Sequence, residues 1–377
     1  MIEAAQFIQA LEENGVGFFT GVPDSLLSSF SAALQPLPRE RHLIAANEGA
    51  AIALAAGYHL ATGGLPLVYL QNSGLGNLVN PLTSLLDETV YGIPVVLLVG
   101  WRGQPGTKDE PQHGKMGAAT VPLLETLGVP VRFLRVGDED VNTLVTDAAR
   151  EARERSAPVA IVVEKGALGE RSLPQQEDYP LSSSAAIGLL SAAFRPGDKV
   201  LCSTGKIGRA FYSWNERQGN PVDAFLNVGA MGHTGSLAAA LALHSDQRIW
   251  LLDGDGALLM HLGALGLIGS LQLKNLNYIL LNNGAHESVG RQPTLGFNID
   301  FCAVARACGF AGALLIENEE SLRRWLSSRE EGLFVEIRIN TRVPADLPRP
   351  AGSLKEAGGR FRSSFQKSND GAAHTAG

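Results

Sequence analysis

The chain has 377 residues, of which 45% are hydrophobic and 18% are charged, and its formal net charge is −7. These values are typical of a soluble protein with room for two α/β domains, and the negative charge excludes a general attraction to nucleic acid or anionic membrane. The three cysteines are scattered and form no disulfide or metal-ligand pattern. Residues 1–14 have the pattern of an amphipathic helix, without the basic start and apolar run of a signal peptide. We therefore expect a cytoplasmic protein that holds any anionic ligand with local groups.

Short apolar runs alternate with helical stretches in the first half of the chain. The runs are residues 17–20, 43–46, 67–70, 95–99 and 159–163. Continuous β-branched runs separated by helices predict a parallel sheet that is covered on both faces. Glu48 follows the second run, in the first turn of an Ala-rich helix whose small residues favour close packing against a neighbour. An acid at that place ordinarily complements the helix dipole.

A polar connector at residues 171–184 separates this half from a second one with the same alternation. The apolar runs of the second half are residues 199–202, 249–252, 278–281, 313–316 and 334–339. We therefore expect an α/β protein with two doubly wound parallel-sheet domains, at residues 1–170 and 185–344, whose sheets can be alike without a sequence repeat. Residues 345–377 are rich in Pro, Gly, Ser and Ala, which predicts a flexible tail that is disordered from about Gly352.

Two short polar motifs follow apolar runs of the second half. Asp253-Gly254-Asp255-Gly256 ends the run at 249–252, and Asn282-Asn283 ends the run at 278–281. A right-handed crossover would place these strands side by side, so that Asp255 and an Asn side chain meet at their carboxyl ends. A helix that starts near Ala257 would aim its free N–H groups at the same place. A carboxylate, an amide oxygen and a backbone carbonyl would leave Mg²⁺ room for two phosphate oxygens and a water, so we predict a metal–diphosphate site. The alternative is a strand–turn–helix unit whose Asn-Gly is only a turn.

The two motifs, their spacing and several longer stretches resemble the phosphonopyruvate decarboxylase family of thiamine diphosphate-dependent 2-oxo acid decarboxylases. The stretches are residues 20–27 (TGVPDSLL), 71–77 (QNSGLGN), 101–103 (WRG), 108–113 (KDEPQH), 203–206 (STGK) and 282–290 (NNGAHESVG). The resemblance covers about residues 1–340. It departs from the family pattern at Ile207-Gly208, where small hydroxyl residues are usual, and at Arg291, where Gly is usual.

The resemblance implies a site for thiamine diphosphate and Mg²⁺ whose residues come from a pyrimidine-binding first domain and a diphosphate-binding second domain. Asp255, Asn283 and the backbone carbonyl of Ala285 would hold the Mg²⁺. The other cofactor contacts of the second domain would be Thr204, Gly205, Gly229, Gly254, Gly256 and Ala257, with Met231 beneath the two cofactor rings. A lone Met more often fills a core, so Met231 depends on the resemblance alone. Glu48 would hydrogen-bond the aminopyrimidine and control its proton, a role that burial would favour by raising the pKa of its carboxyl group.

Acid–base and substrate groups are also implied. Asp24 and His113 would act on the reacting carbon, although Asp24 has the pattern of a helix N-cap and His113 lies in a polar loop, residues 103–114, that is either solvated or closes over substrate. A 2-oxo acid with a phosphonate at its far end needs dense donors and cations. The candidates are Asn72, Ser73, His113 and Lys206, among several nearby Lys and Arg residues whose convergence one sequence does not decide.

The implied reaction is decarboxylation of phosphonopyruvate to phosphonoacetaldehyde and carbon dioxide. Because the cofactor of such enzymes spans two chains, we expect at least a homodimer. Sulfopyruvate suits the same pocket chemistry almost as well and is the nearest competing substrate. The sequence also leaves open an acetolactate-type carboligase, and a non-catalytic module that binds a diphosphate with the same strand–helix geometry.

Overall fold

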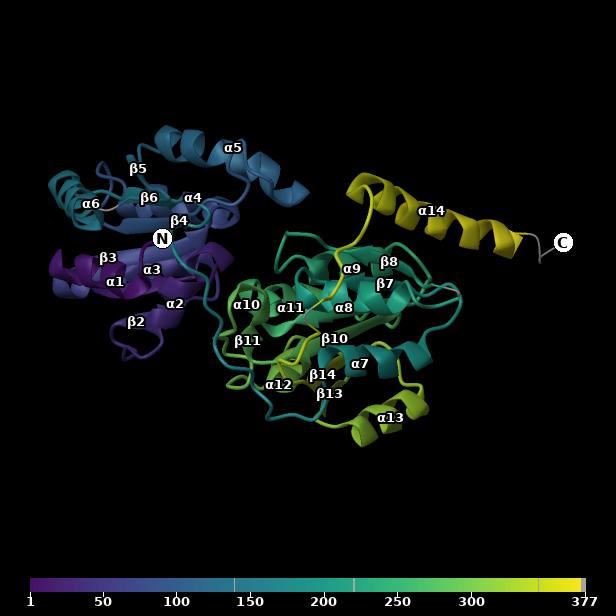
Figure 1. Cartoon of the computed structure of the whole chain (residues 1–377). Helices are drawn as coiled ribbons and strands as arrows, with labels where there is room; N and C mark the ends of the chain where they lie inside the picture. The colour runs from purple at the N-terminus through teal and green to yellow at the C-terminus, as the bar shows by residue number, and fades with distance from the viewer. Residues whose placement is uncertain (139, 220, 345, 374–377) are drawn as a thin grey trace. The chain divides into compact units, whose positions relative to one another are not determined.

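A computed structural model describes residues 1–373 apart from 139, 220 and 345, with side chains as far as Phe365. The chain forms two compact units, Met1–Pro174 with Ser288–Pro293, and Gln175–Glu287 with the chain from Thr294 onward. Each unit is built on one six-stranded sheet with helices around it (Figure 1). Within the described residues, the helices are too short or too polar to cross a membrane.

The sheet of the first unit is parallel throughout, in the order β2-β1-β3-β4-β6-β5. Its strands are β1 (Val16–Gly21), β2 (His42–Ile44), β3 (Leu65–Gln71), β4 (Val96–Gly100), β5 (Val131–Leu134) and β6 (Val159–Val163). The strand order reverses between β1 and β3, and open α/β sheets bind ligands at the carboxyl ends beside such a reversal. Asp24 follows β1 and Asn72 follows β3, so both lie at that end of the sheet.

Helices cover both faces of this sheet, as the continuous apolar runs predict. They are α1 (Ala4–Glu13), α2 (Ser28–Leu34), α3 (Glu48–Thr62), α4 (Leu75–Pro81), α5 (Pro111–Thr126) and α6 (Val141–Arg155), with the short turns η1 (Ser25–Leu27), η2 (Asn72–Gly74) and η3 (Leu82–Leu86). Successive residues of β4 point to opposite faces, so Leu98 packs with α1, α2 and α6, whereas Leu97 and Val99 pack with α3, α4 and α5.

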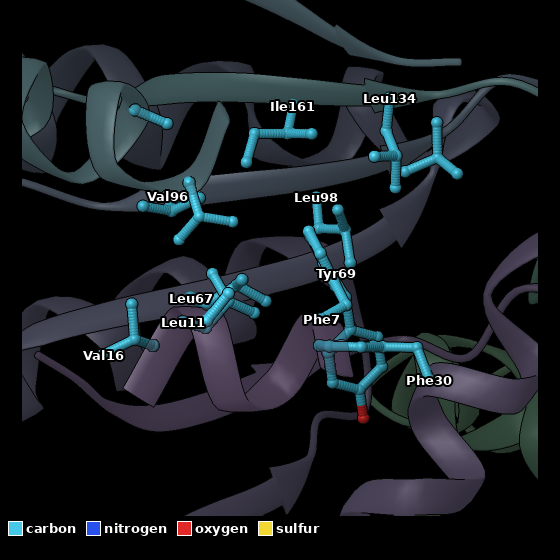
Figure 2. Packing of buried hydrophobic residues seen from close by; sticks show 14 of the residues in the cluster. Phe7, Leu11, Val16, Phe30, Leu67, Tyr69, Val96, Leu98, Leu134 and Ile161 are labelled. Carbon is cyan, nitrogen blue, oxygen red and sulfur yellow. The ribbon is translucent and has the colours of Figure 1, made fainter. Parts of the chain in front are cut away.

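Aromatic rings close one end of the first of these two cores (Figure 2). Phe30 of α2 lies between Phe7 of α1 and Tyr69 of β3, with ring centroids 5.8 and 5.9 Å apart and the rings edge to face. Such pairs contribute about 1 kcal/mol each beyond the area that they bury. The rings thereby fix the two helices against β3.

The sheet of the second unit is also parallel, in the order β13-β14-β10-β9-β7-β8. Its strands are β7 (Lys199–Cys202), β8 (Asp223–Leu226), β9 (Ile249–Gly254), β10 (Leu276–Asn282), β13 (Ala313–Ile316) and β14 (Phe334–Arg338). Counted along the chain, the six strands take the same places as those of the first sheet, so the two sheets are alike although their sequences are not. The strand order reverses between β7 and β9. Strand β9 pairs with β10, with Gly254 opposite Leu281, which confirms that these two strands lie side by side.

Helices cover both faces of the second sheet as well. They are α7 (Ser183–Leu190), α8 (Lys206–Asn215), α9 (Thr234–Leu243), α10 (Asp255–Met260), α11 (Ala264–Ser270), α12 (Phe301–Ala307), α13 (Glu319–Ser328) and α14 (Leu354–Ala373), with the short element η4 (Ser191–Ala193). The short elements β11 (Ala285–His286), η5 (Glu287–Val289) and β12 (Gln292–Pro293) lie in the stretch where the chain leaves the second unit for the first. Helices α7, α8 and α13 pack on one face, and α9, α11 and α12 pack on the other.

Helix α14 begins in the segment for which composition predicts a flexible tail, and its first part packs on the second unit. Phe361 is 8% exposed, and its ring centroid lies 5.6 Å from that of Phe225 in β8. Phe361 and Phe365, one helical turn apart, give the segment an apolar stripe that covers the edge of the sheet, and this pattern outweighs the surrounding Gly and Ser. Residues 374–377 lie outside the described part of the chain.

A short segment of the second half, Ser288–Pro293, belongs to the first unit. Gln292 is fully buried there, and its Nε2 donates to Ser31 Oγ of α2 at 2.8 Å. Gly290 O accepts from Leu173 N at 2.9 Å. The chain then returns to the second unit at Thr294.

Candidate active site

Glu48 is the first residue of α3, capped by Asn47, whose Oδ1 accepts from Ala50 N at 2.9 Å. The side chain is only 4% exposed, and its Oε2 accepts from Asn77 Nδ2 of α4 at 2.7 Å. A Cβ at Gly74 would lie 2.2 Å from Glu48 Oε1, so the carboxyl group fills the space that this glycine leaves. Burial raises the pKa of Glu48, and the bond from Asn77 opposes this only in part. The carboxyl group therefore holds a proton more readily than an exposed glutamate does.

Asp24 caps η1, as its sequence pattern predicts, and its Oδ2 accepts from Leu26 N at 3.0 Å. The side chain is fully buried, and Gly100 leaves room for it, because a Cβ there would lie 2.2 Å from Asp24 Oδ2. Within the described residues, Oδ1 has no hydrogen-bond partner. Burial raises the pKa of Asp24 to about 6, although the charge of Arg102 acts in the opposite direction. Capping therefore leaves one carboxyl oxygen free for other chemistry.

His113 lies in the first turn of α5, where we expected a loop, because Pro111 starts a helix well at its first position. Its side chain is 12% exposed, and Nδ1 lies 2.9 Å from Asp109 Oδ1. Asp109 also accepts two hydrogen bonds from Arg102, from Nε at 2.8 Å and from Nη2 at 2.6 Å. Arg102 Nη1 donates to Ser25 Oγ at 2.8 Å. The histidine is therefore held inside a polar network that reaches the residue after Asp24.

The two substrate candidates that follow β3 differ in their surroundings. Asn72 is buried; its Nδ2 donates to Arg102 O at 2.8 Å and to Thr120 Oγ1 at 2.9 Å, and its Oδ1 accepts from Arg102 N at 3.2 Å. These bonds occupy both amide hydrogens within the unit. Ser73 is exposed, and its Oγ accepts from Gln71 Nε2 at 2.6 Å, so its hydroxyl hydrogen is still able to donate.

In the second unit, Asp255 contacts the second residue of the Asn pair through the backbone N–H of Asn283. Asp255 begins α10 and is 2% exposed; its Oδ1 accepts from Asn283 N at 3.4 Å, and its Oδ2 accepts from Thr294 Oγ1. Burial raises the pKa of Asp255 to about 6. Asn283 Oδ1 accepts from Ala285 N at 3.0 Å. The carboxylate, the amide and the turn at Ala285 thus lie together at the carboxyl ends of β9 and β10.

The first residue of the pair, Asn282, makes hydrogen bonds to residues other than Asp255. Asn282 is fully buried, and its Nδ2 donates to Glu336 Oε1 of β14 at 2.8 Å and to Gly296 O at 2.7 Å. Its Oδ1 accepts from Gly284 N at 3.1 Å. Asn282 therefore anchors the turn in which Asn283 presents its side chain.

The residues around Asp255 fit a hard divalent cation. The donors available are a carboxylate, an amide oxygen and a backbone carbonyl, which are the ligand types that Mg²⁺ prefers. Among the described residues, no group of three His, Cys, Asp or Glu could hold a metal ion, but a set with only one carboxylate would not form such a group. The groups that lower the pKa of Asp255 are uncharged hydrogen-bond donors. A buried carboxylate without a cation is costly, so a bound Mg²⁺ would supply a charge that the site lacks.

The remaining cofactor candidates of the second unit gather after β7, β8 and β9. Gly205 caps α8 with a φ of 96°, a conformation that favours glycine, and the preceding Thr204 accepts from Gly229 N at 3.2 Å. A Cβ at Gly256 would lie 3.4 Å from Met231 Cε and 3.0 Å from His286 Nδ1. Gly254 ends β9, and Ala257 is buried in α10.

Lys206, a substrate candidate, is the first residue of α8. Its Nζ lies 3.7 Å from Glu287 Oε1, and Glu287 Oε2 accepts from Asn283 Nδ2 at 3.3 Å. The structure thus brings Lys206 to the same group of residues as Asn283, in the second unit.

Several residues to which the sequence analysis gave no role hold these groups in place. Asp253 is buried and accepts from Ser203 Oγ, from Gly254 N at 2.9 Å and from Tyr278 OH at 2.6 Å. Ser203 also reaches Thr234 Oγ1 at 3.3 Å, so one network supports the loops after β7 and β9. Asn77 and Asp109 lie within stretches that carry the family resemblance, so the resemblance could have pointed to them. Thr294 has no such signal, because only the fold brings it to Asp255.

Comparison with known proteins places the chain in a family. The thiamine pyrophosphate enzyme N-terminal TPP binding domain matches residues 2–123, and the C-terminal TPP binding domain matches residues 202–332. The phosphonopyruvate decarboxylases of Streptomyces viridochromogenes and Streptomyces hygroscopicus are each 33% identical to this chain, over 96% of it and 94% of the relative. The chain belongs to the thiamine diphosphate-dependent decarboxylases.

A third relative of this decarboxylase is the sulfopyruvate decarboxylase of Methanosarcina acetivorans, which is 28% identical over 94% of this chain and 95% of the relative. Membership of the family makes the protein an enzyme of the carbon–carbon lyase class. The first matched range lies in the first unit and most of the second lies in the second unit, so each unit carries one of the two TPP binding domains.

Proposed function

We propose that this decarboxylase uses thiamine diphosphate and Mg²⁺ to convert phosphonopyruvate to phosphonoacetaldehyde and carbon dioxide. The observation that carries the proposal is the contact of Asp255 with Asn283 at the carboxyl ends of β9 and β10, where a metal–diphosphate group would bind. Among relatives that match nearly the whole chain, the two named for phosphonopyruvate are 33% identical to it and one named for sulfopyruvate is 28% identical, which favours the phosphonate substrate.

In this proposal, the second unit holds the cofactor and the first unit controls protons. Asp255, Asn283 and the carbonyl of Ala285 hold Mg²⁺, and Thr204 and the nearby glycines contact the diphosphate. Thiamine diphosphate, when bound, accepts the electrons that are released as carbon dioxide leaves. Glu48 shares its proton with the aminopyrimidine, for which a carboxyl group with a raised pKa is suited. Asp24 and His113 exchange protons with the substrate-derived group.

The proposal includes at least a homodimer in the cytoplasm. Each site takes Glu48 from one subunit and Asp255 from the other, as the resemblance to enzymes of this family implies. The substrate is then bound between groups of two chains, and a monomer has no complete site.

Sulfopyruvate is the second candidate substrate, because a relative named for it covers nearly the whole chain. A sulfonate carries one negative charge where a phosphonate carries up to two, so the number of cations that face the far end of the substrate decides between them. An acetolactate-type carboligase would differ from a decarboxylase in its response to 2-oxo acids, whereas membership of the family excludes the non-catalytic module that the sequence left open.

The proposal is tested by carbon dioxide release from a panel of 2-oxo acids that includes phosphonopyruvate, sulfopyruvate and pyruvate, with and without Mg²⁺. We expect phosphonopyruvate to have the highest kcat/KM and phosphonoacetaldehyde to be the product. Preference for sulfopyruvate would make sulfopyruvate the substrate, a longer carbon skeleton would indicate a carboligase, and absence of carbon dioxide release from every 2-oxo acid would refute the proposal.

Asp255→Ala tests the metal site in the same assay. We expect this variant to lose Mg²⁺-dependent retention of thiamine diphosphate, measured by calorimetry, because the one carboxylate of the ligand set is gone. Asp246→Ala, which removes an exposed carboxylate of the same unit, is the matched control and should bind cofactor normally. Unchanged cofactor affinity in Asp255→Ala would show that the metal site has been placed wrongly.

A further inference from the structure

Asp109 lies at the centre of the polar network of the first unit. Its Oδ1 accepts from Arg102 Nη2 at 2.6 Å and Glu110 N at 2.8 Å, and lies 2.9 Å from His113 Nδ1. Its Oδ2 accepts from Arg102 Nε and Gly103 N, both at 2.8 Å. The side chain is 10% exposed, so water does not readily replace these partners.

The two-bond contact with Arg102 determines the charge of this carboxyl group. The Arg102 guanidinium holds the pKa of Asp109 well below its usual range, so the group is ionised at every pH at which the protein works. An ionised carboxylate accepts hydrogen bonds and donates none. The His113 nitrogen that faces it, Nδ1, must therefore carry a hydrogen.

The backbone around this network leaves little freedom for a different arrangement. Gly103 has a φ of 68°, and a Cβ there would lie 2.3 Å from His113 O. A Cβ at Gly117 would lie 1.7 Å from Gly103 O, so the segment at Gly103 lies directly on α5. The contact between Asp109 and His113 is thus set by close packing as well as by charge.

The same arginine connects the histidine to the other acid–base candidate. Arg102 Nη1 donates to Ser25 Oγ at 2.8 Å, and Ser25 is the first residue of the turn that Asp24 caps. Asp109 therefore contacts His113 of α5 directly and reaches η1, which Asp24 caps, through Arg102.

We propose that Asp109 is a positioning residue that fixes the proton of neutral His113 on Nδ1, so that Nε2 is the nitrogen that exchanges a proton during turnover. The proposal rests on the proposed function only in giving His113 an acid–base role. The position of the hydrogen, on Nδ1 and not on Nε2, does not depend on the acid–base role of His113 and is measured separately.

The direct test is the nitrogen spectrum of the wild-type holoenzyme labelled with ¹⁵N. The His113 signals are assigned by their loss in His113→Gln, among eight histidines in the chain. At a pH where the imidazole is neutral, we expect Nδ1 to show the shift of a protonated nitrogen and Nε2 that of an unprotonated one. The opposite pattern would overturn the proposal whatever the enzyme catalyses, whereas failure to release carbon dioxide from any 2-oxo acid would affect only the proposed function.

Asp109→Asn tests the consequence for turnover. The amide is uncharged and its NH₂ group cannot accept from Arg102 or His113, so we expect the Nε2–H form to gain population and kcat to fall about ten- to a hundred-fold, with cofactor affinity unchanged. Asp109→Glu keeps the charge and should restore the Nδ1–H form in part. Asp147→Asn is the matched control, because Asp147 also accepts from an arginine, Arg150 at 2.6 Å, but on the surface of α6. A folded Asp109→Asn with wild-type kcat and an unchanged His113 spectrum would refute the positioning role.

Discussion

Burial distinguishes Glu48 from an ordinary acid in the first turn of a helix. Its position after the second apolar run was predictable from sequence, and so was its place in the first turn of a helix. The depth of its burial was not, because it depends on Gly74 and Asn77, which lie on a different element. The sequence position of Glu48 was therefore predictable, whereas the burial that raises its pKa depends on residues elsewhere in the chain.

Glu48→Gln should keep the packing and remove the proton. The amide has the size of the carboxyl group and still accepts from Asn77, so we expect the variant to bind thiamine diphosphate with near wild-type affinity and to lose turnover by at least about a hundred-fold. Calorimetry and carbon dioxide release measure the two effects. Glu125→Gln, at an exposed position on α5, is the control and should behave as wild type. Near-normal decarboxylation by Glu48→Gln would remove Glu48 from its proposed role.

Asp24 should make the stability of the cofactor-free protein depend on pH. Its pKa is raised from 3.8 to about 6 by burial, with the charges of Arg102 and Asp109 acting nearby, so the folded state binds its proton more tightly than the unfolded state does. Stability from this group is fully present below about pH 4 and is lost as pH rises through about 6, by about 3 kcal/mol in total. Urea unfolding of wild type and Asp24→Asn between pH 4 and pH 7 measures the difference. We expect the variant to lose less stability over that range, and parallel curves would contradict the assignment.

Arg291 illustrates a departure from the family pattern that has a physical basis. Its φ is 61°, in the left-handed region, where glycine is favoured and other residues are strained. Arg291 Nη1 donates to Leu173 O, a bond that glycine could not make. The sequence indicated which residue was unusual, but only the backbone conformation explains why.

At the scale of elements, central strands were easier to predict than edge strands. The missed strands, β5 and β8, are the last members on one edge of each sheet, and their residues are mostly half-buried. An edge strand pairs with only one other strand and is less covered by helices, so it needs no continuous apolar run. The apolar pattern that marks β3 or β10 is therefore weak in β5 and β8. The start of α5 was also missed, because the polar and glycine residues before it gave the whole segment the composition of a loop.

Gly74 is an element-scale determinant of the site, because it lets η2 and α4 lie against the start of α3. Gly74→Ala should displace the Glu48 carboxyl group, since the new Cβ would lie 2.2 Å from Oε1, and turnover should fall on the order of a hundred-fold while the fold is kept. Gly76→Ala, two residues further on in α4, is a close control, because a Cβ there meets nothing within 4 Å. Carbon dioxide release and circular dichroism separate the two effects. Equal activity in both variants would mean that turnover does not depend on the position of the Glu48 carboxyl group.

At the scale of the whole molecule, the two units have the same strand order and yet carry different chemistry. Each has candidate site residues after the two strands at which the order reverses, Asp24 and Asn72 in one unit, and Thr204 and Asp255 in the other. The likeness of the sheets was expected from the repeated alternation of apolar runs. Which residues follow each reversal could be read from the sequence only once strand order was known.

A hybrid dimer tests whether a site takes residues from two chains. When Glu48→Gln and Asp255→Ala chains are co-expressed, a mixed dimer has one site with both wild-type residues if the sites are shared, and none if each site lies within one chain. Random mixing should then give about a quarter of wild-type activity, although each variant alone is inactive. Differently tagged chains allow the mixed dimer to be purified and assayed. An inactive mixed dimer would exclude a shared site.

The segment Ser288–Pro293 means that the backbone passes between the two units three times, after Pro174, Glu287 and Pro293. A protease that cuts only after Pro174 would give two chains, residues 1–174 and 175–377, that are still held together by the packing of Ser288–Pro293 in the first unit. The second unit produced alone would also carry Gln292 without Ser31, its buried partner. Thr294, the first residue of the second unit after this segment, donates to Asp255, so the backbone re-enters that unit at a residue that touches the proposed magnesium ligand.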